Sequence, residues 1–97
     1  MNLNQPGIYK ITNLVNGKFY IGSSVILRKR LTSHKRDLNN NKHANRYLQN
    51  SWNKYGEDNF EFSVLEIVEK INNNSTLSLM INNLEKYWIK FYNSNNK

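Results

Sequence analysis

The chain has 97 residues, no cysteine and a formal net charge of +7 at pH 7. This length favours a single small domain, and the lack of cysteine excludes disulfides and thiolate metal sites. No segment approaches the roughly 18 apolar residues that a membrane span requires, and the N-terminus lacks the pattern of a secretory signal. We therefore expect an intracellular protein with no membrane partner.

The positive charge is concentrated in the middle of the chain. Segment 18–54 contains nine Lys or Arg and one acidic residue, whereas segment 55–97 contains six acidic residues and four lysines. Charge gathered in this way is typical of a protein that binds a polyanion, most often nucleic acid. A solvated, lysine-rich surface is the alternative.

Aromatic and β-branched residues flank the dipeptide Asn16-Gly17 and predict a β-hairpin near the N-terminus. If these two residues form the whole loop, position 20 pairs with position 13. Since side chains alternate along a strand, one face then carries Tyr9, Asn13, Lys18, Tyr20 and Gly22. The opposite, more apolar face carries Ile8, Leu14, Phe19 and Ile21. A loop longer by one residue would place the two tyrosines on opposite faces.

Two helices are expected after the hairpin. The first covers about residues 25–39, begins at a Ser23-Ser24 cap, and buries Leu27, Leu31 and Leu38. Within it, Arg30 and His34 are four residues apart and therefore neighbours on one helix face. The second helix covers about residues 45–55 and ends at Gly56. Its inward side chains are Leu48, Trp52 and Tyr55.

The last third of the chain predicts one strand and one helix. Segment 59–68 alternates in the manner of a strand. The final helix, over about residues 76–92, has an apolar stripe of Leu77, Ile81, Leu84, Trp88 and Phe91, with Glu85 at its edge. The order ββααβα predicts a small α+β domain, with a three-stranded antiparallel sheet flanked by helices. Fold alone does not determine function.

Common catalytic signatures are absent from the sequence. It has no Walker loop, HExxH motif or calcium loop, and two histidines without cysteine make structural zinc an unfavourable interpretation. The remaining side chains with useful chemistry are Tyr9, Tyr20, Arg30, His34, His43 and Glu85. Taken singly, each is more simply a sheet aromatic or a polar surface residue.

Their combination resembles the GIY-YIG nuclease family. The chain contains "GIY" at 7–9 and "YIG" at 20–22, with Arg30 eight residues beyond the second motif. "LQNSWNKYG" at 48–56 and "LEKYWI" at 84–89 extend the resemblance over nearly all of residues 1–97. It is closest to the catalytic module of GIY-YIG homing endonucleases, and it implies a divalent-metal-dependent endonuclease acting on double-stranded DNA.

The resemblance also implies a role for each candidate. Glu85 would hold one Mg²⁺ (or Mn²⁺) ion, because magnesium accepts a single carboxylate together with waters and a substrate phosphate. Arg30 would contact the cleaved phosphate. Tyr9 would act as general base, provided that nearby cations lower its pKa, with Tyr20 orienting water or phosphate. His43 is an alternative base, and His34 would orient a phosphate or a neighbouring side chain.

The expected DNA contacts are Lys18, Lys35, Arg36, Lys42 and Arg46, which would position the phosphate backbone without reading sequence. In the related homing-endonuclease modules a Gly-Tyr-Asn-like segment follows the last helix, whereas this chain ends in "YNSNNK". We therefore expect a monomeric module from the N-terminal part of a longer protein, with a linker and a DNA-binding domain elsewhere. A non-catalytic nucleic-acid-binding module and a repair-type incision domain are the alternatives.

Overall fold

The computed structural model describes residues 2–69 and 73–95. Its strands are β1 (Gly7–Asn13), β2 (Phe19–Ser24) and β3 (Phe60–Ile67), and its helices are α1 (Leu27–Asn39), α2 (Arg46–Tyr55) and α3 (Asn74–Asn95). A short 3₁₀ helix, Glu57–Asn59, precedes β3. The expected order ββααβα and the α+β class are confirmed.

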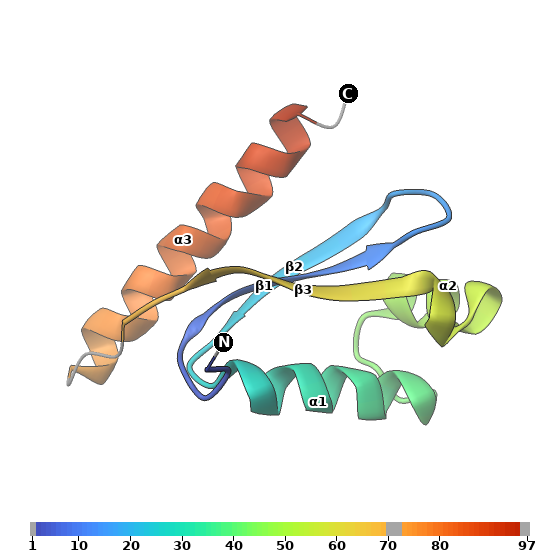
Figure 1. The fold of residues 1–97 in the computed structure, drawn as a ribbon, viewed down its shortest axis with the longest axis horizontal. Helices are drawn as coiled ribbons and strands as arrows, with labels where there is room; N and C mark the ends of the chain where they lie inside the picture. Colours follow the sequence, from blue (N-terminus) through green and yellow to red (C-terminus); the bar gives the residue numbers. More distant parts are fainter. Residues whose placement is uncertain (1, 70–72, 96–97) are drawn as a thin grey trace.

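The three strands form one antiparallel sheet in the order β2-β1-β3, so the first strand is central. Figure 1 shows α1 and α3 on opposite sides of this sheet, with α2 near the end of the sheet that carries the β1–β2 loop. One sheet face is therefore covered by α1 and α2, and the other by α3.

The hairpin loop is longer than expected, but the two tyrosines still share a face. Thr12 pairs with Phe19, and Tyr20 lies opposite Ile11 rather than opposite Asn13. The loop thus contains four residues, 14–17, and Gly17 adopts a φ of 77°, which glycine tolerates without strain. A loop longer by two residues preserves the alternation of side chains. Leu14 lies in this loop and is 58% exposed, so its assignment to the apolar face was wrong.

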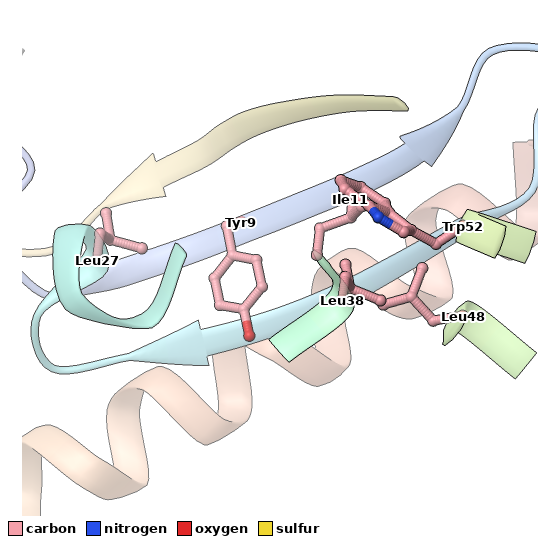
Figure 2. Packing of buried hydrophobic residues seen from close by; sticks show 6 residues of the cluster. All are labelled: Tyr9, Ile11, Leu27, Leu38, Leu48 and Trp52. Atoms are coloured by element: carbon pink, nitrogen blue, oxygen red, sulfur yellow. The ribbon is translucent and has the colours of Figure 1, made fainter. Parts of the chain in front are cut away.

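Each sheet face has its own apolar core. Under α1 and α2 the buried residues are Tyr9, Ile11, Leu27, Leu38, Leu48 and Trp52 (Figure 2). Under α3 they are Ile8, Ile21, Val68, Leu77 and Ile81. Full burial of one such side chain stabilises the fold by about 1.5–3 kcal/mol. The expected inward position of Phe91 was wrong, because its side chain is 41% exposed and the adjacent Tyr92 packs against the core instead.

The ends of the first two helices follow different local rules. The expected Ser23-Ser24 cap was wrong: α1 begins at Leu27, with Ile26 as an N-cap that lacks a side-chain bond. The Ser24 hydroxyl instead forms a turn with the backbone of Ile26. In α2, the Asn45 side chain accepts a hydrogen bond from the Leu48 N–H, as an N-cap does. Within the described part of the chain, no helix is long and apolar enough to cross a membrane.

Candidate active site

Four of the sequence-predicted side chains meet on the sheet face that α1 covers. The Tyr9 and Tyr20 rings stack with centroids 6.4 Å apart, and the His34 ring lies 5.2 Å from the Tyr9 ring and 5.4 Å from the Tyr20 ring. Arg30, one helix turn before His34, acts on both phenols through its charge. The hairpin and α1 together therefore build one polar cluster.

The glycine of the second motif makes room for Tyr9. Tyr9 lies opposite Gly22 in the β1–β2 ladder, and its ring extends from β1 towards β2 (Figure 2). A Cβ atom on Gly22 would overlap the Tyr9 hydroxyl and would lie 2.5 Å from Cζ. The space taken by the Tyr9 ring is therefore the constraint that requires glycine at position 22.

Gly22→Ala should destabilise the fold by about 1–3 kcal/mol, the usual cost of overpacking a filled core. Chemical denaturation of both proteins would measure this difference. Gly17→Asn is the matched control, because a Cβ there meets no atom within 4 Å and asparagine tolerates a positive φ. Equal stability of Gly22→Ala and the parent protein would contradict this account of the YIG motif.

A chain of three hydrogen bonds fixes the proton positions in the cluster. The Asn45 N–H donates to His43 Nδ1 (3.0 Å), so neutral His43 carries its proton on Nε2. This Nε2 lies 2.6 Å from His34 Nδ1 and donates to it, which leaves the His34 proton on Nε2. His34 Nε2 lies 2.5 Å from the Tyr9 oxygen. The Tyr9 oxygen is therefore an acceptor, and its own proton is free for another partner.

Gln49 holds His43 in this chain. The Gln49 Oε1 accepts a hydrogen bond from the His43 N–H at 3.0 Å, while its amide donates to the Leu38 carbonyl and to Asn53 Oδ1, each at 3.0 Å. The side chain is buried, so it ties the C-terminal end of α1 to α2 and sets the position of the His43 ring between them.

Burial determines the charge states of these groups. It raises the pKa of Tyr9 to about 12, an effect that Tyr20 and Glu85 reinforce and that Arg30 opposes. Burial, helped by the charge of Arg30, also lowers the pKa of His34 to about 4, and burial lowers the pKa of His43. At neutral pH Tyr9 is a neutral phenol and both histidines are neutral. A general base at neutral pH needs a lowered pKa, and we expected nearby cations to lower that of Tyr9. In the protein without DNA or metal, burial outweighs the charge of Arg30 and the pKa of Tyr9 is raised instead.

Acidification should destabilise the fold through His34, which is 1% exposed. Its pKa is about 4 in the folded state, compared with 6.5 for an unperturbed histidine, so the unfolded chain binds the proton first. Stability is complete above pH 6.5 and falls as the pH drops towards 4, by about 2–3 kcal/mol at pH 4.5. Denaturation at pH 7 and pH 4.5 measures this loss. In His34→Gln the loss of stability between pH 7 and pH 4.5 should be smaller by about 2–3 kcal/mol. An unchanged loss in this variant would show that the pH dependence does not come from His34.

Glu85 approaches the cluster from the other face of the sheet. It lies on α3 and is partly buried, and its Oε1 accepts a hydrogen bond from the Ser23 hydroxyl at 2.7 Å. The negative charge of Glu85 also acts on Tyr9, whose pKa it raises. Within residues 2–69 and 73–95, no three His, Asp or Glu side chains gather into a metal site. A lone carboxylate still fits a magnesium ion that is otherwise bound by water and a substrate phosphate.

The five expected DNA contacts are all exposed, and two of them form surface ion pairs. Lys35 pairs with Glu57 at 3.3 Å and Arg36 with Asp37 at 3.4 Å; such surface ion pairs contribute little and can be exchanged. Arg46 begins α2, Lys42 precedes it, and Lys18 lies at the end of the β1–β2 loop.

Three supporting groups were not predicted from the sequence, namely Ser23, Gln49 and the backbone N–H of Asn45. Ser23 was assigned to a helix cap, and Gln49 had no assigned role. Ser23 acts on Glu85 and Gln49 acts on His43, and in both cases the partner comes from another segment of the chain. No local sequence pattern therefore indicates these roles. For Asn45, its N-cap preference was the one usable signal, and it places the amide N–H that bonds to His43.

The whole chain resembles characterised catalytic domains. A family model described as the GIY-YIG catalytic domain matches residues 5–97. Intron-associated endonuclease 1 of Enterobacteria phage T4 is 39% identical over 90 residues, which cover 93% of this chain and 34% of that protein. The chain thus spans about a third of the length of this curated relative.

Two solved structures share the fold. The catalytic domain of the homing endonuclease I-TevI superposes with a TM-score of 0.75 at 38% identity, covering 93% of this chain and 90% of that one. A mutant of the same catalytic domain, with a glutamate replaced by alanine, gives a TM-score of 0.77 at 37% identity, covering 93% and 86%.

Proposed function

Because the chain belongs to the GIY-YIG catalytic domain family, as its two tyrosine motifs predicted, we propose that it is a DNA endonuclease domain that hydrolyses phosphodiester bonds. The observation that carries this proposal is the convergence of Arg30, Tyr9, Tyr20 and His34 on one face of the sheet. Hydrolysis requires stabilisation of a phosphate that gains negative charge and a group that accepts a proton from water. The cluster supplies a permanent cation, Arg30, and the Tyr9 oxygen, which is held by the His34 Nε2–H.

Arg30 is the group that we expect to meet the cleaved phosphate. Its side chain is exposed, whereas Tyr9 is 1% exposed and its ring stacks against that of Tyr20. Arg30 carries five N–H donors, so it can bind phosphate oxygens while it remains beside the phenols. Movement of the Tyr20 or Arg30 side chain on DNA binding then exposes the Tyr9 oxygen.

Tyr9 is the proposed general base, and the hydrogen bonds made by the two histidines favour it over His43. His43 Nδ1 already accepts the Asn45 N–H, and His34 Nδ1 already accepts the His43 proton. Their remaining nitrogens are donors. The Tyr9 oxygen, in contrast, accepts N–H bonds that favour its phenolate form. Because His34 Nε2 is occupied by a proton, the Tyr9 proton must leave towards the solvent side before each reaction.

We further propose that Glu85 holds a single divalent cation, Mg²⁺ or Mn²⁺. When bound, such an ion would neutralise negative charge on the phosphate and on the leaving oxygen. The Ser23 hydroxyl orients the Glu85 carboxylate by donating to Oε1, which leaves Oε2 for a cation. Target selection would lie with a separate DNA-binding domain, since the phage relative is about three times as long as the matched segment.

Supercoiled plasmid incubated with Mg²⁺ tests this function. We expect nicking that EDTA stops and that Glu85→Gln suppresses. Glutamine keeps an oxygen for the Ser23 hydroxyl, so the fold should persist. Glu61→Gln, an exposed carboxylate on β3, is the matched control and should cut normally. DNA binding without cutting would instead indicate a non-catalytic module, and cutting restricted to damaged DNA would indicate a repair-type incision domain.

A further inference from the structure

A hollow of about 170 Å³ lies next to Tyr20, between the β1–β2 loop and α2. Figure 1 shows these two elements at the same end of the sheet. Its lining includes the buried residues Ile11 and Leu48 and the half-buried Phe60, and we refer to these three apolar residues as its floor. Tyr20 belongs both to this hollow and to the catalytic cluster, so the hollow adjoins the position expected for the cleaved phosphate. We refer to it as the Tyr47 hollow, after the aromatic residue on its rim.

Tyr47 has no evident role in the stability of the fold. Its side chain is 88% exposed although it is a large aromatic residue, and it stands at the rim of the hollow near Lys18. Exposed aromatic rings next to cations are typical of surfaces on which unstacked bases are held, with the cation on the adjoining phosphate. A volume of about 170 Å³ is below the roughly 300–1,000 Å³ of drug-sized ligand sites, and it suits a single planar ring.

Asn13 contributes an unpaired donor to the same hollow. The residue is 2% exposed, and its Oδ1 accepts the Val15 N–H at 2.9 Å. Its Nδ2 is buried and has no hydrogen-bond partner among the described residues. Buried polar groups are nearly always paired, and Asn13 lines the hollow, so a small movement of its side chain can pair this buried donor with an acceptor on a ligand.

We propose that the Tyr47 hollow binds the base of a nucleotide adjacent to the cleaved bond, and that it gives the domain a base preference at this position. The inference rests on the proposed DNA cleavage and extends it to substrate selection. The apolar floor packs on the face of the base, Tyr47 stacks on it at the rim, and Lys18 contacts the neighbouring phosphate.

The hydrogen-bonding groups of the hollow determine which bases fit. Asn13 Nδ2 is a donor only, so it favours a base that presents an acceptor to it. Guanine and thymine present carbonyl oxygens where adenine and cytosine present amino groups. We therefore expect guanine or thymine to be favoured over adenine or cytosine at one position beside the cut, by about fivefold or more.

Cleavage of a DNA library with randomised bases, followed by sequencing of the cut ends, tests the proposal. Tyr47→Ala removes the stacking ring, and Ser51→Leu places a larger side chain in the lining of the hollow. Both should flatten the preference while cutting continues. Asn13→Asp keeps the acceptor for Val15 but removes the donor, and it should shift the preference towards adenine and cytosine. Tyr87→Ala, which removes an exposed aromatic residue on α3, is the matched control and should leave the preference unchanged.

The outcomes separate this inference from the proposed function. If the parent protein cuts without base preference, or if its preference survives both Tyr47→Ala and Ser51→Leu, the hollow does not bind a base. An equal loss of preference in Tyr87→Ala would also overturn the proposal. If the parent protein binds DNA but does not cut it, the endonuclease function fails, and the base site fails with it.

Discussion

Replacing Arg30 with alanine should slow DNA cleavage by about a hundred- to a thousandfold, which corresponds to about 3–4 kcal/mol of transition-state stabilisation. Arg30 is exposed and is the permanent cation that acts on both Tyr9 and Tyr20. Its removal deprives the phosphate of a charged, forked donor without opening the core. Single-turnover cleavage at saturating DNA measures the effect.

Two further variants show whether the effect depends on position and on geometry. Arg28→Ala removes an exposed arginine from the same helix and should leave cleavage almost unchanged. Arg30→Lys keeps the charge but loses the planar fork, so its rate should fall between those of the parent and Arg30→Ala. If Arg28→Ala and Arg30→Ala lower the cleavage rate by similar factors, Arg30 contributes only to general DNA affinity and does not contact the cleaved phosphate.

Tyr9→Phe should lower the rate by about a hundred- to ten-thousandfold, the range for loss of a positioned general base. The pKa of Tyr9 is about 12, so the phenolate fraction of the parent protein rises about tenfold per pH unit throughout the neutral range. The cleavage rate should rise with the same slope. The titratable and charged groups that act on Tyr9 are Tyr20 on β2, Arg30 and His34 on α1, and Glu85 on α3.

The pH profile of the variant distinguishes a base from a structural tyrosine. In Tyr9→Phe the residual rate should lose the slope that Tyr9 imposes. The loss of the hydrogen bond to His34 leaves an N–H unpaired and costs about 1–3 kcal/mol of stability, so unfolding must be measured in parallel. Tyr87→Phe, on exposed α3 surface, is the control. A slope that persists in Tyr9→Phe would assign the base to another group.

The sequence alone determined most of the local structure. Asn16-Gly17, Asn45 and Gly56 mark a hairpin loop and the ends of α2 because their preferences depend on backbone geometry within a few residues. The shared face of Tyr9 and Tyr20 followed from the alternation of side chains, although the loop was two residues longer than expected. The motif residues likewise indicated the family, and the spacing of Arg30 and His34 placed both on one face of a helix.

Tertiary structure decided how these elements act on one another. The central position of β1, the placement of α3 on the opposite face and the approach of Glu85 to Ser23 depend on contacts between distant segments. The proton positions in His43, His34 and Tyr9 follow from one backbone N–H at the start of α2. The pKa of Tyr9 was the largest departure from expectation, because burial outweighs the charge of Arg30. A side chain's burial, unlike its helix or strand propensity, is set by what the rest of the chain packs against it.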